Sequence, residues 1–301
     1  MTGMIGGICN NPEDYASFYH NYKGRRYRHD QVHNLFGYYM TRSASEAFER
    51  YVPEKRILLF SRASYIGMHR FGGIWQGDNA SWWSHLKMNV KMMPSLNMCG
   101  FLYTGADVGG FGADATEDLV LRWLEFAVFT PLLRNHSARG TRRQEVYRFS
   151  HVEKFADVIG VRYQILPYIY SEYMKAALQN TMMFNPLAFL YGEDTLAGQV
   201  EDQLFIGENI MVAPVCEQNV SGRVVYFPEH MKEMQMGTVH IFLREGYLFP
   251  VAKGGKCVED VDFEDLTLYS FGKEIKPYEY YLDDGETKDF NMETHIRILS
   301  C

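Results

Sequence analysis

Cysteine is scarce in this chain of 301 residues, and its 5 cysteines stand far apart. They are odd in number and form no CxxC pair, so the sequence offers neither a disulfide framework nor a zinc site. Residues 1–7 lack the basic and apolar regions of a signal peptide, and no apolar run reaches the length of a membrane span. These absences predict a soluble, cytoplasmic protein without membrane contact. The cysteines are Cys9, Cys99, Cys216, Cys257 and Cys301.

A surplus of positive charge is also missing. The net charge is −7, and the one basic run, at residues 23–29, has no nucleic-acid-binding motif around it. No glycine-rich phosphate loop follows any apolar run, so no nucleotide cofactor is indicated. His29, Asp30 and His33 have helical spacing, but a metal site would need a further convergent ligand. The sequence therefore predicts no nucleic-acid partner, no cofactor and no metal.

Aromatic side chains are what the sequence has in excess, at 15% of residues, with 21 Tyr and 20 Phe. Dense core packing explains most of them, and the sharper interpretation is that some rings form platforms for sugars. The hydrophobic share of 47% and the charged share of 22% are typical of a folded protein with one large or two smaller domains.

Helical patterns and short apolar runs alternate along the first two thirds of the chain. Helices are expected at residues 33–51, 81–98, 116–129 and 152–178, the last broken near Pro167, with strands at 57–60, 100–105, 130–133 and 184–190. This alternation predicts parallel strands joined by helices, as in half of a (β/α)8 barrel. A doubly wound sheet is the alternative, although its usual phosphate loop is missing.

The pattern changes after about residue 200. Short apolar runs at residues 210–215, 224–228, 239–243 and 278–282 are separated by turn signals at 219–222 and 283–285. Such runs predict antiparallel strands of a β-sandwich. The expected fold class is therefore α/β plus all-β, with half of a TIM barrel followed by antiparallel β structure.

One carboxylate has surroundings that suit sugar chemistry. Residues 73–79 read Gly-Ile-Trp-Gln-Gly-Asp-Asn, which places Asp78 in a glycine-flanked loop close to Trp75. A carboxylic acid beside an aromatic wall can stay protonated near neutral pH and so donate a proton. Further ionisable groups follow the expected strands: Arg62 the first, Asp107 the second and His136 the third. In a parallel barrel these positions converge on one face.

Several ordered motifs follow one another along the chain: Ser-Arg at residues 61–62, Trp-Gln-Gly-Asp-Asn at 75–79, Gly-Ala-Asp-Val-Gly-Gly-Phe at 105–111, Phe-Thr-Pro at 129–131 and Arg-Asn-His-Ser at 134–137. Together they resemble glycoside hydrolase family 31, most closely its bacterial α-glucosidases of the isomaltase-like kind. His-Asn-Leu-Phe-Gly at 33–37, Ile-Gly at 206–207, Ala-Pro-Val at 213–215 and Asp-Asp-Gly at 283–285 extend the resemblance over nearly the whole chain.

The resemblance implies a role for each of these residues. Asp78 matches the general acid/base of a retaining mechanism, and Arg62 and His136 match groups that hydrogen-bond sugar hydroxyls. Trp75 and Phe111 match the aromatic walls of the subsite, and Asp107 matches an acidic residue that supports it. The alternatives stay open at this point: Trp75 as plain core, His136 as a structural histidine, and Asp107 as a backbone cap or an arginine partner.

The chain departs from the family in one respect. The Trp-x-Asp-Met-Asn-Glu segment that carries the family's nucleophile is missing, which leaves Asp78 without the second carboxylate of a retaining glycosidase. We expect the chain to be poorly stable or inactive alone, and to need an amino-terminal half or a partner chain. The resemblance implies half of the barrel at residues 1–192, a proximal β domain at 193–255 and the start of a distal β domain at 256–301.

The predicted function is retaining hydrolysis of terminal α-linked glucose in oligosaccharides. An α-xylosidase or an α-glucan lyase of the same family is the alternative within the enzyme class. An inactive fragment that binds carbohydrate is the alternative outside it.

Overall fold

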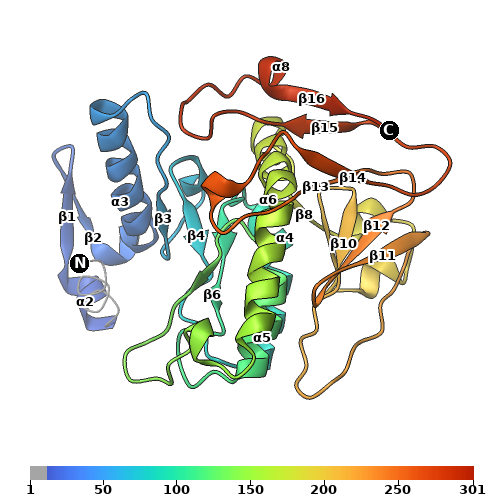
Figure 1. Ribbon diagram of the computed structural model, residues 1–301. Coiled ribbons are helices and arrows are strands. Elements are labelled where there is room, and N and C mark those ends of the chain that lie inside the picture. Colours follow the sequence, from blue (N-terminus) through green and yellow to red (C-terminus); the bar gives the residue numbers. More distant parts are fainter. Residues whose placement is uncertain (1–11) are drawn as a thin grey trace. The chain divides into compact units, whose positions relative to one another are not determined.

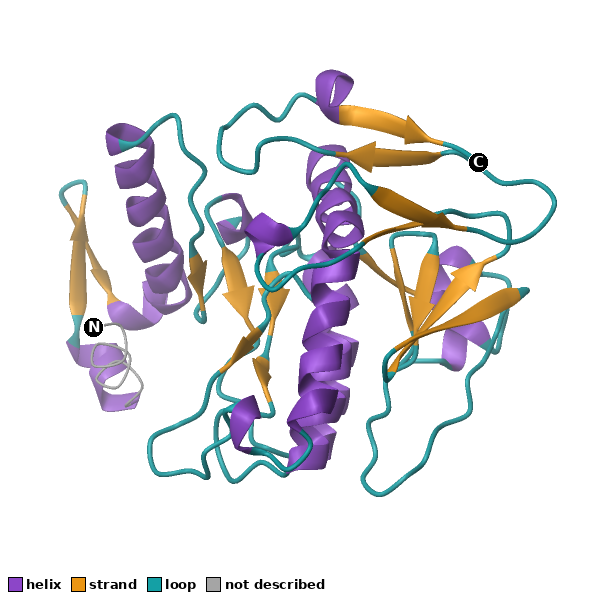
Figure 2. Ribbon diagram, viewed as in Figure 1, coloured by secondary structure: helices purple, strands orange, loops and turns teal. Residues whose placement is uncertain are grey.

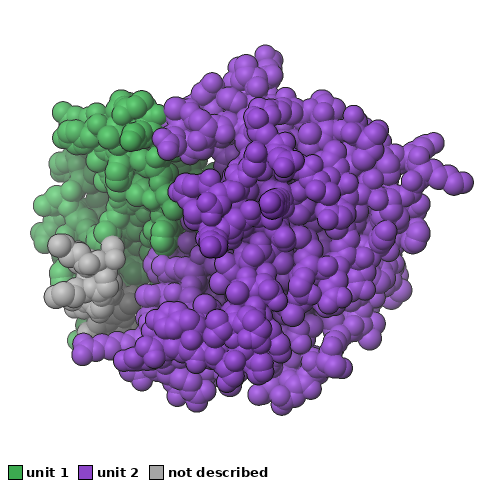
Figure 3. Space-filling view, in the orientation of Figure 1, with its two compact units in different colours: residues 1–74 green, residues 75–301 purple. Residues whose placement is uncertain are grey.

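The structure, a computed structural model, describes residues 12–301 and divides into two compact units, residues 1–74 and 75–301 (Figure 3). Cys9 and the residues considered for a signal peptide lie outside the described part. None of the helices in the described part is long and apolar enough to cross a bilayer. The domain boundaries expected near residues 192 and 255 stay a prediction.

The first unit is built around one long helix. The hairpin β1–β2 turns at Lys23 and Gly24, whose positive φ angles of 49° and 75° suit a tight hairpin turn. Helix α3 follows and begins four residues before the expected position, since His29 opens it. The elements are α2 (Pro12–Ser17), β1 (Tyr19–Tyr22), β2 (Arg25–Arg28), α3 (His29–Tyr51), β3 (Phe60–Ser61), η1 (Met68–Arg70) and the first residues of β4 (Gly73–Trp75).

Parallel pairing in this unit is short. Strand β3 pairs with β4 through Phe60↔Gly73 and Ser61↔Ile74, so the strand expected at residues 57–60 is reduced to its last residue and the next one. The Cβ that any other residue would add at position 72 would lie 2.7 Å from the carbonyl oxygen of Leu59. Glycine is therefore what lets the two segments approach so closely.

The second unit begins with the remaining α/β part (Figures 1 and 2). Strands β6 and β7 are parallel, and helix α5 starts with Thr116 as its N-cap, whose Oγ1 accepts the Leu119 N–H at 3.3 Å. The strand expected at 130–133 is wrong, because that segment is irregular and pairing starts at Arg134. The elements are α4 (Trp83–Met98), β5 (Thr104–Gly105), β6 (Asp107–Val108), α5 (Glu117–Ala127), β7 (Arg134–Asn135), η2 (Val146–Arg148) and α6 (Val152–Gln179).

Helix α6 runs without interruption through Pro167, so the expected break is wrong. A proline inside a helix costs about 3 kcal/mol through its lost hydrogen bond and its ring clash. Here the helix buries a long apolar face that includes Phe155, Ile165 and Tyr168, and it packs against β13 and β15. Tertiary packing outweighs the local penalty, and the same face joins the α/β part to the β strands in one core (Figure 1).

The rest of the chain is antiparallel, as expected. The five-stranded sheet has the order β11-β12-β10-β9-β8, and β13–β14 and β15–β16 form separate pairs. The elements are β8 (Phe184–Pro186), α7 (Leu187–Leu190), η3 (Ala197–Gln199), β9 (Leu204–Ile206), β10 (Ile210–Val212), β11 (Met231–Met236), β12 (Val239–Arg244), β13 (Phe249–Ala252), η4 (Val258–Asp260), β14 (Leu266–Tyr269), β15 (Tyr278–Tyr281), α8 (Met292–His295) and β16 (Ile296–Leu299).

Two further expectations are corrected here. The segment 184–190 is not a fourth parallel strand, because β8 pairs antiparallel with β9 and is followed at once by α7. Residues 224–228 form no strand, although Tyr226 exchanges hydrogen bonds of 2.8 Å with the side chain of Gln203. An apolar run predicts burial, but no residue of this run is fully buried, and Val224 is 90% exposed.

Candidate functional site

A buried ion pair joins the two short parallel strands β6 and β7. Asp107 stands opposite Arg134 in the register, and Arg134 Nε donates to Asp107 Oδ1 at 2.6 Å. Asp107 is fully buried, and its Oδ2 has no hydrogen-bond partner among the described residues. A buried carboxylate is usually paired, and this one has one oxygen bonded and the other without a described partner.

Burial raises the pKa of the Asp107 carboxyl above its ordinary value. The hydrogen bond and charge of Arg134, and the charge of His136, act against this rise, while the charge of Asp78 adds to it. Desolvation prevails because a carboxylate loses its water shell here and gains only one donor in exchange. The electrostatic influence of Asp78 and His136 on this group shows that three of the predicted site residues share one electrostatic environment.

The Arg134 guanidinium also faces the indole ring of Trp75. The guanidinium carbon lies 5.4 Å from the ring centroid, within the range of a cation–π contact. Trp75 is half-buried, and the next residue, Gln76, donates its N–H to the Gly105 carbonyl at 2.9 Å. The ring is therefore held beside the Asp107–Arg134 pair and is not simply part of the hydrophobic core.

Asp78 is exposed on the loop that follows. The loop is fixed by its backbone, since the Asn79 carbonyl accepts the N–H groups of Phe111 at 2.7 Å and Gly112 at 2.9 Å. Ser81 in turn donates its N–H to the Gly112 carbonyl at 2.7 Å. The loop carrying the predicted acid/base is thus clamped to the loop after β6, which carries the predicted aromatic wall.

A glycine makes this clamp possible. Gly110 has a φ of 88°, and a Cβ at this position would lie 2.6 Å from the backbone nitrogen of Ser81. Any other residue would combine a strained backbone conformation with a clash against main-chain atoms. The backbone conformation and this close contact therefore explain why the second glycine of the Asp-Val-Gly-Gly-Phe motif is a glycine.

Phe111 and His136 form the second aromatic pair of the site. Their ring centroids are 5.1 Å apart at an interplanar angle of 31°, and Ala138 donates its N–H to the Phe111 carbonyl at 2.8 Å. His136 is exposed and Phe111 is half-buried. Both rings are thus held between protein and solvent, where a sugar could reach them.

Sequence reasoning missed the amide of Gln144, whereas the arginine partner considered for Asp107 is confirmed and is Arg134. Gln144 lies in an irregular segment just before η2, where no periodicity predicts burial, yet it is only 2% exposed. Its Nε2 lies 3.1 Å from the carbonyl oxygens of Val108 and Gly110 and from Asn135 Oδ1. Together with His136 and the exposed Tyr147 it also lines a cavity of about 470 Å³ behind the loop after β7.

Of the six predicted site residues, five lie in the second unit: Trp75, Asp78, Asp107, Phe111 and His136. Arg62 is exposed directly after β3 in the first unit, and its convergence with the others stays a prediction. The roles assigned to all six also stay predictions.

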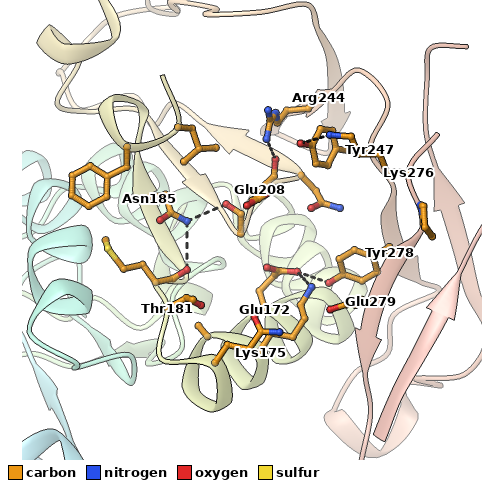
Figure 4. A pocket seen from close by; sticks show the side chains of 18 residues that line it. Glu172, Lys175, Thr181, Asn185, Glu208, Arg244, Tyr247, Lys276, Tyr278 and Glu279 are labelled. Atoms are coloured by element: carbon orange, nitrogen blue, oxygen red, sulfur yellow. Dashed lines mark hydrogen bonds and ion pairs between the residues drawn. The ribbon is translucent and has the colours of Figure 1, made fainter. Parts of the chain in front are cut away.

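A larger cavity, of about 780 Å³, lies between the end of α6 and the β strands (Figure 4). Its charged side chains engage one another: Lys175 Nζ lies 2.6 Å from Glu172 Oε1, which accepts the Tyr278 hydroxyl at 2.6 Å, and Lys276 donates to Tyr247. The polar groups of this cavity therefore serve mainly to join α6 to β15, and none of the predicted site residues lines it.

The histidines considered for a metal are bonded to one another. His29 Nδ1 lies 2.7 Å from His20 Nε2 and His29 Nε2 lies 2.8 Å from His33 Nδ1, whereas Asp30 pairs with Arg28. Within residues 12–301 no group of three or more His, Cys, Asp or Glu side chains is arranged to hold a metal ion.

Comparison with known families gives two matches that together cover most of the chain. The family described as glycosyl hydrolases family 31 TIM-barrel domain matches residues 6–172, which is more than half of the chain. The family described as glycosyl hydrolase family 31 C-terminal domain matches residues 180–248.

Two curated relatives match this chain over most of its length. Alpha-glucosidase 2 of Bacillus thermoamyloliquefaciens is 29% identical over 93% of this chain and 38% of its own length. Neutral alpha-glucosidase AB of Homo sapiens is 29% identical over 91% of this chain and 31% of its own length. The chain thus spans about a third of the length of these relatives.

Solved structures agree on the fold. A Flavobacterium johnsoniae dextranase complexed with glucose superposes with a TM-score of 0.82 at 23% identity, over 95% of this chain and 39% of the dextranase. A family 31 alpha-glucosidase from Bacteroides thetaiotaomicron superposes with a TM-score of 0.75 at 27% identity, over 88% of this chain and 45% of that enzyme.

Proposed function

The chain belongs to glycosyl hydrolase family 31, and on that premise we propose that it is the part of a retaining α-glucosidase that carries the acid/base and much of the glucose subsite. The observation that carries the proposal is that backbone hydrogen bonds and a ring contact join three loops around Asp78. The Asn79 carbonyl binds the loop of Phe111, and the Phe111 ring contacts His136.

Asp78 is proposed to act as the general acid and then as the general base. Its exposed carboxyl would protonate the glycosidic oxygen as the bond breaks, and as a carboxylate it would then take a proton from the attacking water. Since the rigid backbone clamp fixes the position of the loop, the acid would meet the glycosidic oxygen without reorganisation of the main chain.

The surrounding residues are proposed to hold the glucose ring. Trp75 and Phe111 offer ring faces to the apolar face of a pyranose, and His136 offers a ring nitrogen to a hydroxyl group. The Oδ2 atom of Asp107 is the best-placed buried acceptor for a second hydroxyl, while Arg134 holds the other oxygen of the same carboxylate. These contacts would orient the sugar relative to Asp78.

The nucleophile is proposed to come from a separate segment, either another part of a longer protein or a partner chain. A retaining glycosidase needs a second carboxylate roughly 5–5.5 Å from the acid/base. Asp107 is poorly suited, because it is fully buried, bonded to Arg134, and has a raised pKa that disfavours the ionised form. The relatives, of which this chain spans about a third, leave room for such a segment.

The proposed substrate is a terminal α-linked glucose of an oligosaccharide. The names of the relatives, alpha-glucosidase 2 and neutral alpha-glucosidase AB, support the glucosyl unit. Among the structural neighbours, one dextranase variant is described as complexed with isomaltotriose and a glucosidase II alpha subunit as alpha3-Glc2-bound, so the linkage is left to experiment.

The proposal is tested by measuring hydrolysis of an aryl α-glucoside by two samples. One is this chain alone, and the other is this chain combined with the segment that carries the nucleophile. We expect glucose release by the combination, and a loss on the order of 10²–10⁴-fold in Asp78→Asn. The exposed Asp289→Asn is the matched control and should keep full activity.

Other outcomes would change the assignment. Preference for an aryl α-xyloside would indicate an α-xylosidase, and an unsaturated sugar product would indicate a lyase. If this chain, combined with the nucleophile segment, binds sugar without hydrolysing it, the chain is an inactive carbohydrate-binding fragment. Full activity in Asp78→Asn would contradict the assignment of the acid/base.

A further inference from the structure

The buried side-chain amide of Gln144 lies where two loops of the candidate site meet. Its Nε2 is 3.1 Å from the carbonyl oxygens of Val108, the last residue of β6, and of Gly110, in the loop after β6. On the other side it is 3.1 Å from Asn135 Oδ1 and 3.4 Å from the carbonyl oxygen of His136, at the end of β7. Asn135 Nδ2 closes the arrangement by donating to the Gln144 carbonyl at 2.7 Å. One nitrogen thus connects both loops.

The orientation of this amide follows from its surroundings. All four neighbours of Nε2 are acceptor oxygens, which need a donor, and an amide nitrogen carries two hydrogens to share among them. The Oε1 atom is buried and has no hydrogen-bond partner among the described residues. The side chain therefore acts here as a donor, and a group without N–H could not replace it.

The two connected loops carry the side chains expected to contact the sugar. Phe111 directly follows Gly110, and His136 directly follows Asn135. The same loops hold the loop of Asp78, because Phe111 donates its N–H to the Asn79 carbonyl. A shift at Gln144 would consequently move the aromatic wall, the histidine and the acid/base loop relative to one another.

We propose that Gln144 is a positioning residue that sets the relative placement of Phe111 and His136 and, through the Asn79 backbone clamp, of Asp78. This inference rests on the proposed function, because the benefit of the placement is sugar binding and hydrolysis. Gln144 acts through other residues and does not itself touch the substrate. Errors of about 1 Å in such placement lower rates by as much as 10²-fold.

The chain offers a closely matched control in Gln203. This residue is also 2% exposed, its Nε2 donates to the Tyr226 carbonyl at 2.8 Å, and its Oε1 accepts the Tyr226 N–H at 2.8 Å. It lies just before β9 in the antiparallel part, and the partners of its side chain, Met211 and Tyr226, are not among the predicted site residues. Changes at the two positions remove a buried donor of the same kind, but only Gln144 connects the loops of the site.

The experiment compares Gln144→Glu with Gln203→Glu, using the chain combined with its nucleophile segment. In Gln144→Glu a carboxylate faces four acceptor oxygens, so we expect kcat/KM for an aryl α-glucoside to fall at least tenfold. Gln203→Glu should keep kcat/KM within twofold even where urea unfolding shows a similar loss of stability. Gln144→Met and Gln203→Met, which keep the shape and remove the donor, repeat the comparison should a glutamate variant fail to fold.

Amide hydrogen exchange supplies a readout that needs no substrate. The N–H groups of Phe111, Gly112 and Ala138 bond across the loops, so their exchange should accelerate at least tenfold in the Gln144 variants and stay unchanged in the Gln203 variants. Unchanged exchange in the Gln144 variants would overturn the proposal, as would equal losses of kcat/KM at both positions. If the wild type hydrolyses nothing, the proposed function fails, while the exchange data still decide whether Gln144 positions the loops.

Discussion

The two halves of the second unit hold their polar side chains in place by different means. In the α/β half, β6 and β7 pair through only two residues each, Asp107↔Arg134 and Val108↔Asn135. In the antiparallel half, β11 and β12 pair through six residues each. A long ladder fixes its side chains by the regular spacing of a sheet, whereas a two-residue ladder leaves that task to loops.

The buried charges show the same contrast. Asp107 has one bonded oxygen and one without a described partner, and it lies among loops that open to solvent. Glu172 is almost as buried, yet the same Oε1 atom is bonded by both Lys175 and Tyr278, which joins α6 to β15. Burial alone therefore does not indicate function, and incomplete satisfaction beside a solvent-accessible loop is the better sign.

The largest expected effect comes from comparing two glycines, Gly110 and Gly285, which both have a positive φ but differ in their surroundings. Gly110→Ala adds both backbone strain and a clash with Ser81, and should lower the free energy of unfolding by about 3 kcal/mol. Gly285, in the antiparallel half, has a φ of 72° and no heavy atom within 4 Å of an added Cβ, so Gly285→Ala should cost only about 1 kcal/mol. Urea denaturation measures both, and equal losses would show that the loop clamp is not crowded.

The second prediction removes a buried hydroxyl from the antiparallel half. Tyr278→Phe deletes the donor to Glu172 Oε1 and should lower the free energy of unfolding by about 1.5 kcal/mol. Because Glu172 keeps Lys175 and lies away from the site loops, kcat/KM should not change. A loss of kcat/KM larger than twofold would mean that the two halves are coupled more strongly than their contacts suggest.

The third prediction compares two exposed histidines. His136→Ala removes a ring that contacts Phe111 and is expected to bond a sugar hydroxyl, so glucose affinity should fall about tenfold with little change in stability. His230→Ala, in the antiparallel half beside Glu245, should leave glucose affinity unchanged. Titration calorimetry measures both variants, and an unchanged affinity in His136→Ala would remove His136 from the subsite.

The smallest expected effect is a difference in pH dependence between two aspartates. Burial raises the pKa of Asp107 in the folded state, so the wild type should gain stability relative to Asp107→Asn as pH falls through that raised pKa toward 3.8, the ordinary value. The pKa of Asp194 is lowered, first by the Tyr226 hydroxyl and then by backbone N–H groups. The wild type should therefore lose stability relative to Asp194→Asn as pH falls below 3.8. Urea unfolding of the variants across this range would reveal the opposite signs, and parallel curves would contradict them.

The apolar patterns in the sequence predicted helices well, but they predicted poorly which segments form strands. The apolar spacing that predicted helices at 81–98 and 116–129 reflects the burial of one face, and α4 and α5 confirm both. The apolar run at 130–133 is partly buried and the run at 224–228 is half-buried or exposed, and neither became a strand. A strand also needs a partner in register, and the run itself says nothing about that partner.

The amino-acid sequence by itself determined the order of α/β and antiparallel parts, the family, and the motifs that contain Trp75, Asp78 and Phe111. In the structure Trp75 ends β4, and Asp78 and Phe111 lie on loops. Only the tertiary structure decided that Asp107 pairs with Arg134, that Pro167 leaves α6 intact, and that Gln144 connects two loops. The reason is physical: Gln144 and Val108 are separated by 36 residues, and a hydrogen bond over that separation exists only once the backbone between them has folded. Periodicity and motifs are local, whereas the placement of the site depends on contacts between distant segments.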